Sequence, residues 1–217
     1  MKTLRILAVI LFCTCSVLSV KAQYSVQRAF EIVGFSDLPY EAAKNNPRGQ
    51  SVGVENPKDI IPNKLYRDFQ GSDFVLAECG SELAPVLFAK FQVPDSDWIL
   101  GAVAFGGATD LETTSLIVAD KQGNITSTLE AEVQFGLIAA KQFRITGEGQ
   151  VIITTLVPTA STSVKFSDFK QISACKVDEI YSINSSGIFV KVSEQKSAPQ
   201  TYSRSELDTL ECDLWNL

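Results

Sequence analysis

The sequence contains no histidine, and it has only one methionine and five cysteines among its 217 residues. Without an imidazole, a Ser-His-Asp or Cys-His nucleophile pair, a histidine-ligated zinc or haem and a histidine pH switch are all excluded. The remaining composition, 45% hydrophobic and 20% charged, is that of a folded domain rather than of a disordered or collagen-like chain. The length allows one domain or two small ones.

The first 22 residues have the pattern of a secretory signal peptide. Lys2 and Arg5 are followed by an uncharged apolar run over residues 6–20, and the small residue Ala22 precedes Gln23. A basic start, an apolar stretch of this length and a small residue before the cut are typical of that signal. The run is also shorter than the about 20 apolar residues of a transmembrane helix. We expect cleavage between Ala22 and Gln23, and a periplasmic or extracellular protein with no transmembrane segment in its mature chain.

Cleavage at this point changes both the charge and the number of cysteines. The signal carries three of the 19 basic residues and no acid, so the mature chain has 16 Lys and Arg against 25 Asp and Glu, a net charge of −9. That balance argues against nucleic acid or an anionic membrane as a partner, because both are bound through basic patches. The cysteines that remain, Cys79, Cys175 and Cys212, predict either buried thiols or one disulfide, for which Cys175–Cys212 is the first candidate.

The mature chain divides into an irregular N-terminal arm over residues 23–68 and a β-rich domain over residues 69–217. Pro, Asn and Gly are frequent in the arm and interrupt any regular period, so we expect an extended segment with one helical turn near residues 40–44. Strands are expected where β-branched and aromatic residues are bounded by turn residues. These segments are residues 74–78, 86–93, 98–105, 114–119, 125–134, 137–146, 151–157, 177–183 and 188–192.

The strand over residues 125–134 has the clearest alternation of polar and apolar residues. Its apolar side chains fall on one face, and Glu130 and Glu132 fall with other polar residues on the opposite face, which predicts one buried and one wet face. Three pairs of strands are joined by polar turns that end in glycine, as antiparallel hairpins require. These glycines are Gly123, Gly149 and Gly187.

The C-terminus has helical signals. Ser203 and Glu206 have the spacing of a capping box, and three leucines follow at helical intervals, so we expect a short helix from about Arg204 to Asp213. The predicted fold class is therefore mainly β. It is an antiparallel sheet domain, either a sandwich or a curled, propeller-like sheet, with an irregular N-terminal arm and a short C-terminal helix.

One hairpin resembles a hairpin that recurs in small exported β-sheet proteins of Gram-negative bacteria. An apolar strand is followed by Asp120-Lys121-Gln122-Gly123, then by a second strand that ends in Ser127-Thr128-Leu129-Glu130, and later by Phe143-Arg144-Ile145-Thr146. The resemblance covers about residues 114–156. Because that group is largely uncharacterised, the resemblance implies a periplasmic or surface β-domain and brings no catalytic residues with it.

The candidate groups for chemistry each have a more ordinary role. Glu130 and Glu132 on one strand face could supply paired carboxylates like those of glycosidases, but charged residues are usual on the wet face of a strand. Asp95 and Asp97 could supply oxygen ligands to a hard cation, but the rest of a calcium loop is missing and a solvated turn explains them. We therefore predict no catalytic residue, no cofactor and no metal site.

The expected function is a non-enzymatic binding or interaction protein of the bacterial envelope, with a protein or glycan partner. Trp98 and Trp215 are candidates for its binding surface, because tryptophan is common in binding hot spots, and burial in the core is their alternative role. Two other functions stay open. One is a carboxylate-dependent hydrolase of glycan or peptidoglycan, and the other is an inhibitor or immunity-type protein that neutralises a secreted partner through its acidic surface.

Overall fold

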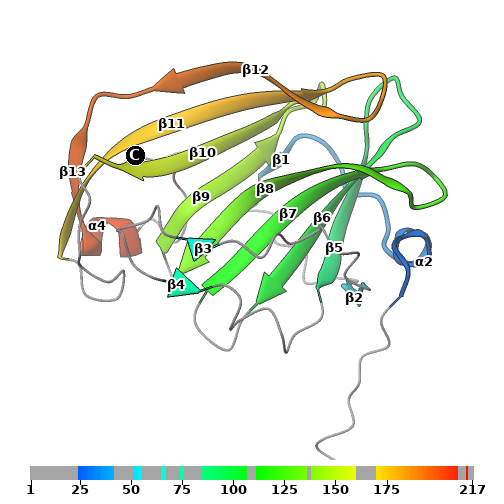
Figure 1. The fold of residues 1–217 in the computed structure, drawn as a ribbon, viewed down its shortest axis with the longest axis horizontal. Helices are drawn as coiled ribbons and strands as arrows, with labels where there is room; N and C mark the ends of the chain where they lie inside the picture. Colours follow the sequence, from blue (N-terminus) through cyan, green and yellow to red (C-terminus); the bar gives the residue numbers. More distant parts are fainter. Residues whose placement is uncertain are drawn as a thin grey trace, which may run out of the picture.

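The structure is a computed structural model, and it describes residues 24–41, 51–54, 65–66, 74–75, 85–106, 111–135, 138–159, 170–209 and 214. The described part is mainly β, as the sequence predicts (Figure 1). Its helices are α2 (Val26–Ile32) and α4 (Arg204–Thr209), and its short strands are β1 (Tyr40–Glu41), β2 (Val52–Gly53), β3 (Leu65–Tyr66), β4 (Phe74–Val75) and β13 (Gln200–Ser203). Its long strands are β5 (Val86–Gln92), β6 (Ile99–Gly106), β7 (Leu111–Ala119), β8 (Ile125–Phe135), β9 (Ile138–Ile145), β10 (Val151–Pro158), β11 (Gln171–Ile183) and β12 (Phe189–Lys196).

Within the described residues, 11 strands form one antiparallel sheet in the order β12-β11-β10-β9-β8-β7-β6-β5-β2, with β1 beside β9 and β13 beside β11. Strands β3 and β4 pair separately. From β5 to β12 each strand pairs with the next one along the chain, so the sheet is a meander. The architecture is therefore one curled sheet rather than a sandwich of two separate sheets.

The three glycine turns are confirmed as hairpin turns. Gly123, Gly149 and Gly187 have φ values of 81°, 79° and 72°, a left-handed conformation that other residues adopt at a cost. The amide of each glycine donates to the carbonyl oxygen three residues earlier, at 3.0, 3.0 and 2.9 Å respectively. These turns set the register of the hairpins β7–β8, β9–β10 and β11–β12.

The sheet folds back on itself around an inner core. The Tyr40 ring lies 4.8 Å from the Phe91 ring of β5 and 5.9 Å from the Phe143 ring of β9, measured between ring centres. In a flat sheet these two strands would be about 19 Å apart, at about 4.8 Å per strand. The curl seen in Figure 1 brings them together. The inner core consists of Tyr40, Ala89, Phe91, Val93, Leu100, Ala102, Leu116, Val118, Ala131, Phe143, Ile145, Val151 and Ile153.

A second, outer core lies between helix α2 and the opposite face of β5 to β7. It includes Ala29 and Phe30 of the helix together with Ile117 of β7. Gly101 of β6 is needed here, because a Cβ at this position would lie 2.9 Å from the Phe30 ring and 3.1 Å from the Ile117 side chain. Both faces of β6 and β7 are therefore buried, which explains their nearly continuous apolar sequences.

The described part of the N-terminal arm differs from the expected irregular segment. Helix α2 begins after Ser25, whose hydroxyl accepts a hydrogen bond from the Arg28 amide, and it was not expected from the sequence. The helical turn expected near residues 40–44 is instead strand β1 at its start, because Tyr40 pairs with Ile145 at the edge of β9. Residues 42–44 lie outside the described residues.

The C-terminal helix α4 begins where the sequence predicts. Ser203 and Glu206 form the expected capping box: the Ser203 amide donates to the Glu206 carboxylate at 2.6 Å, and the Glu206 amide donates to the Ser203 hydroxyl at 3.2 Å. Further along, the amide of buried Leu214 donates to Oε1 of Gln142 on β9 at 2.7 Å, so the segment packs on the sheet. Among the described residues, no helix has the length and apolar character to span a membrane.

Candidate functional site

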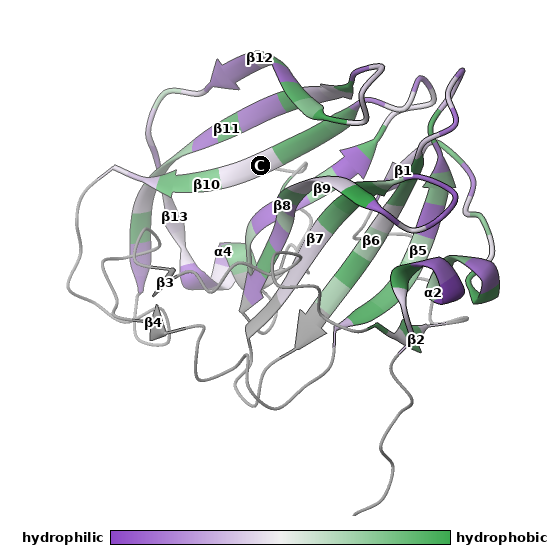
Figure 2. Cartoon of the chain, turned by 45° about the vertical axis from the view of Figure 1, so that its right-hand side comes forward, coloured by the Kyte–Doolittle hydropathy of each residue, from purple (hydrophilic) through white to green (hydrophobic). Residues whose placement is uncertain are grey.

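The hairpin β11–β12 carries the largest group of exposed apolar side chains in the described part of the chain. Ile188, Val190 and Val192 are 39%, 41% and 51% exposed, and they follow one another at alternate positions. Figure 2 shows the apolar start of β12 beside its hydrophilic end. We call these three residues the hairpin surface. Isolated exposed apolar residues are normal, whereas a group of them marks a candidate interaction surface.

Local hydrogen bonds hold the turn that presents this surface. The side-chain oxygen of Asn184 accepts hydrogen bonds from the amides of Ser186 and Ile188, both at 3.0 Å. Gly187 occupies the left-handed position that the turn requires. The turn is therefore defined by its own residues, and it places Ile188 directly before the strand.

Strand β12 is the last strand of the sheet, but its edge is poorly suited to pairing with another strand. Tyr181 pairs with Lys191 and Ile180 pairs with Ser193, which leaves Val192 as the extra residue of a β-bulge. Bulges and charged residues are the usual means by which edge strands resist the addition of a further strand. The exposed feature of this strand is therefore its apolar side chains rather than a free backbone edge.

An ion-pair network accompanies the bulge. The Lys191 ammonium lies 2.7 Å from the Glu194 carboxylate and 3.0 Å from the Glu179 carboxylate. These hydrogen bonds raise the pKa of Lys191, and the same contact lowers the pKa of Glu194. Lys191 and Glu194 are therefore held in their charged forms by this contact.

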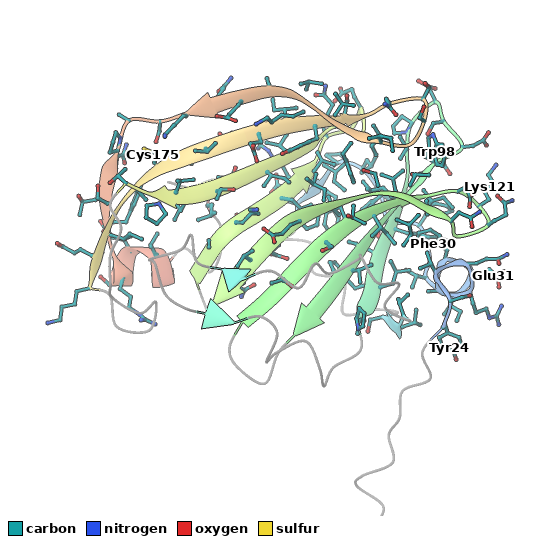
Figure 3. All side chains as sticks on the ribbon, viewed as in Figure 1. Tyr24, Phe30, Glu31, Trp98, Lys121 and Cys175 are labelled. Atoms are coloured by element: carbon teal, nitrogen blue, oxygen red, sulfur yellow. The ribbon has the colours of Figure 1, made fainter. Side chains whose placement is uncertain are left out.

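The structure places Trp98 under the turn rather than on the hairpin surface. Its ring is partly buried against the inner core, and its indole N–H donates to the Ser185 carbonyl oxygen at 3.2 Å (Figure 3). A Cβ at Gly187 would lie 2.8 Å from the Trp98 ring, so the turn sits directly on the indole. Trp98 thus supports the turn next to the surface. The other candidate, Trp215, lies outside the described residues.

The two carboxylates Glu130 and Glu132 do not share a strand face, contrary to the sequence interpretation. Glu130 is opposite Ser115 and Glu132 is opposite Thr114, which leaves Ala131 as the extra residue of a bulge. Because neighbouring residues of β7 point to opposite faces, the bulge separates the two glutamates. The expected wet face is also partly covered, since both side chains are half-buried.

Each of these glutamates has a different partner. Glu130 forms an ion pair with Lys141 at 2.6 Å, and both side chains are mostly shielded from solvent. Glu132 accepts a hydrogen bond from the Thr114 hydroxyl at 2.8 Å. The arrangement supplies no pair of carboxylates facing a common point, which is the geometry that glycoside hydrolysis needs.

Tyr40 carries a buried polar atom for which the sequence contains no signal. Its side chain is 3% exposed, and its hydroxyl has no hydrogen-bond partner among the described residues. Burial raises the pKa of Tyr40, and the nearby negative charge of Glu132 raises it further. The hydroxyl therefore stays protonated inside the inner core.

The remaining predicted residues are placed as follows. Asp97 pairs with Lys121 at 2.7 Å in an exposed turn, and Asp95 occupies a left-handed position in the same turn. Among the described residues, no three side chains of the kinds that bind metal ions gather together. Cys175 is buried in β11, whereas Cys79, Cys212 and the cleavage position at Ala22 and Gln23 lie outside the described residues. The pairing Cys175–Cys212 stays a prediction.

The sequence predicts the strand over residues 188–192 but not its position in the sheet, so it does not reveal the hairpin surface. Residues 188–192 have an ordinary strand pattern, and the pattern does not tell an edge strand from a central one. A signal was nevertheless available. In a meander the last strand is an edge, and the apolar start of this strand is followed by Ser193, Glu194 and Gln195.

Comparisons with protein-family models, with curated proteins and with solved structures found no match for this chain.

Proposed function

We propose that this chain is an exported, non-enzymatic protein that binds a protein partner through the hairpin surface. The observation that carries the proposal is the group of three exposed aliphatic side chains, Ile188, Val190 and Val192, at the end of the sheet. The signal pattern that ends at Ala22 supports export. Aliphatic side chains without an exposed aromatic ring beside them favour a protein over a glycan, because sugar rings are usually bound by stacking on aromatic rings.

The net charge of the mature chain indicates what kind of partner it would attract. The mature chain carries a net charge of −9, so a partner with an apolar patch and a basic surround would be attracted at long range. Such an attraction weakens when salt is added, because dissolved ions screen charges about 10 Å apart at 0.1 M ionic strength. The expected complex is therefore one whose formation slows at high salt and whose stability depends on the aliphatic side chains.

The proposal is tested by cross-linking in intact source cells with three forms of the mature chain. The double substitution Val190→Ser and Val192→Ser removes two of the three aliphatic side chains of the hairpin surface. The control Val157→Ser changes a residue that is 38% exposed on β10 and pairs with Cys175, at the other end of β11 from the hairpin surface. We expect one cross-linked protein that is retained by wild type and by the control and is lost from the double variant.

Two results would contradict the proposal. One is a cross-linked protein that is lost equally from the control and from the double variant. The other is a cross-linking pattern that is identical for all three forms. Both results would mean that the hairpin surface is not where a partner binds.

A further inference from the structure

The sheet closes its curl between β8 and the β11–β12 turn without a backbone ladder in the described residues. Strand β8 pairs with β7 and β9, and β12 pairs with β11. The β11–β12 turn and the start of β12 are instead joined to β8 and to Trp98 by three hydrogen bonds, each of which uses a side chain. These bonds, which we call the clasp, are Trp98 Nε1 to the Ser185 carbonyl at 3.2 Å, Thr126 Oγ1 to the Gly187 carbonyl at 2.7 Å and the Phe189 amide to Ser127 Oγ at 3.2 Å.

The clasp covers one end of the inner core. Trp98, Phe189 and Ile183 are partly buried and pack against that core. Gly187 is buried because it sits close to Thr126 and to the Trp98 ring, which leaves no room for a side chain. Lifting the turn would therefore uncover aromatic side chains rather than another polar surface.

The turn is held less firmly than the strands that it joins. Asn184, Ser185 and Ser186 are exposed, so the turn buries little apolar area of its own. A segment with few buried apolar contacts and few protected backbone hydrogen bonds opens locally at a lower free energy than the whole molecule unfolds. The hairpin itself stays intact during such an opening, because its internal bond from the Asn184 amide to the Ile188 carbonyl, at 3.0 Å, does not involve β8.

We infer that the clasp opens independently of global unfolding, and that its opening exposes the aromatic end of the inner core to solvent. This inference does not depend on the proposed protein partner, because it concerns the side of the hairpin that faces the core. The clasp then acts as a strap over Trp98, Phe189 and Ile183, which are covered while it is closed.

Amide hydrogen exchange of the whole mature chain tests the opening step. The Phe189 amide reports on the clasp, whereas the Asn184 amide reports on the hairpin. We expect the Phe189 amide to exchange faster than the Asn184 amide and faster than global unfolding allows. In Thr126→Val we expect the Phe189 amide to exchange about fivefold faster still, the factor that corresponds to the net contribution of about 1 kcal/mol for one hydrogen bond.

A matched control and a probe complete the experiment. Thr159→Val also removes a hydrogen bond from a threonine hydroxyl to a backbone carbonyl, from Thr159 Oγ1 to the Ser173 carbonyl at 3.1 Å, at an exposed site outside the clasp. Binding of the apolar dye anilinonaphthalene sulfonate should rise in Thr126→Val and in Trp98→Phe, which keeps a smaller aromatic ring but loses the indole N–H, and should stay at the wild-type level in Thr159→Val.

Three outcomes would overturn the inference. The Phe189 amide could exchange only at the rate of global unfolding, or Thr159→Val could change its exchange as much as Thr126→Val does. Dye binding could also stay unchanged in both clasp variants while exchange rises, which would show that the opening does not expose the apolar side chains of the inner core. A protein partner found or lost at the hairpin surface would change none of these readings.

Discussion

The two ends of strand β8 are closed in different ways. Toward its C-terminal end, Val133 and the residues that follow pair with β9 through the backbone. Toward its N-terminal end, Thr126 and Ser127 meet the β11–β12 turn through their side chains. A backbone ladder survives most changes of side chain, whereas the clasp is weakened by the loss of one hydroxyl or one indole N–H. The curl therefore has one side that is fixed by the fold and one side that the sequence can tune.

The largest effect is expected on the fixed side. Phe143 of β9 is fully buried in the inner core and stacks on Tyr40, so Phe143→Ala should lower the free energy of unfolding by about 3–5 kcal/mol. Urea denaturation measures this change. Phe35→Ala is the control, because that ring is 55% exposed and lies over the Lys90 ammonium, a contact whose loss should cost about 0.5–2 kcal/mol. Equal losses in both variants would show that the inner core does not hold the fold closed.

A smaller effect is expected at the clasp. Gly187→Ala forces a left-handed conformation on alanine, which costs about 1–2 kcal/mol. Its new Cβ would lie 2.7 Å from Thr126 Oγ1, so the turn must lift, and the Phe189 amide should lose protection from exchange.

The matched control for this substitution is Gly149→Ala. Gly149 has nearly the same φ, and its Cβ would press on the Pro94 ring rather than on Thr126 and the Trp98 ring. Both variants should lose similar stability, but only Gly187→Ala should expose the Phe189 amide. Loss of protection in both variants would mean that the clasp reports general destabilisation and does not move as a unit.

The sequence could predict the parts of this fold that depend on local signals. Gly123, Gly149 and Gly187 mark hairpin turns because the left-handed position favours glycine over its neighbours. The Ser203–Glu206 capping box is equally local, since each residue bonds the backbone of the other. Strand positions, turn positions and the start of α4 followed from such signals.

The parts that could not be predicted depend on contacts between distant residues. The bulge at Ala131 shifts Glu132 relative to Glu130, and alternation along one strand does not reveal a shift that its partner strand imposes. The exposure of Val190 and Val192 depends on β12 lying at the edge of the sheet. Helix α2 was overlooked because frequent proline and asparagine later in the arm hid the cap at Ser25.

The smallest effect is expected at Tyr40, and it should have the opposite sign. Its hydroxyl is buried between the two sides of the curl, without a hydrogen-bond partner in the part of the chain that the structure describes. Tyr40→Phe therefore removes a desolvated polar group and should raise the free energy of unfolding by about 1 kcal/mol at neutral pH. Tyr202→Phe is the control, because the Tyr202 hydroxyl has a partner in Gln200 at 3.4 Å and its removal should not stabilise the protein.

The pH dependence of the same variant gives a second, independent reading. Burial, and then the charge of Glu132, raise the pKa of Tyr40 above its ordinary value of about 10. A raised pKa in the folded state means that the stability linked to this proton is complete below about pH 10 and is lost as the pH rises above it, because the unfolded chain then releases the proton first. Wild type should therefore lose more stability than Tyr40→Phe between neutral pH and about pH 11, as measured by urea denaturation at each pH. An equal loss in both proteins, together with a destabilised variant at neutral pH, would show that the hydroxyl is paired and that this part of the inner core is wetter than its burial indicates.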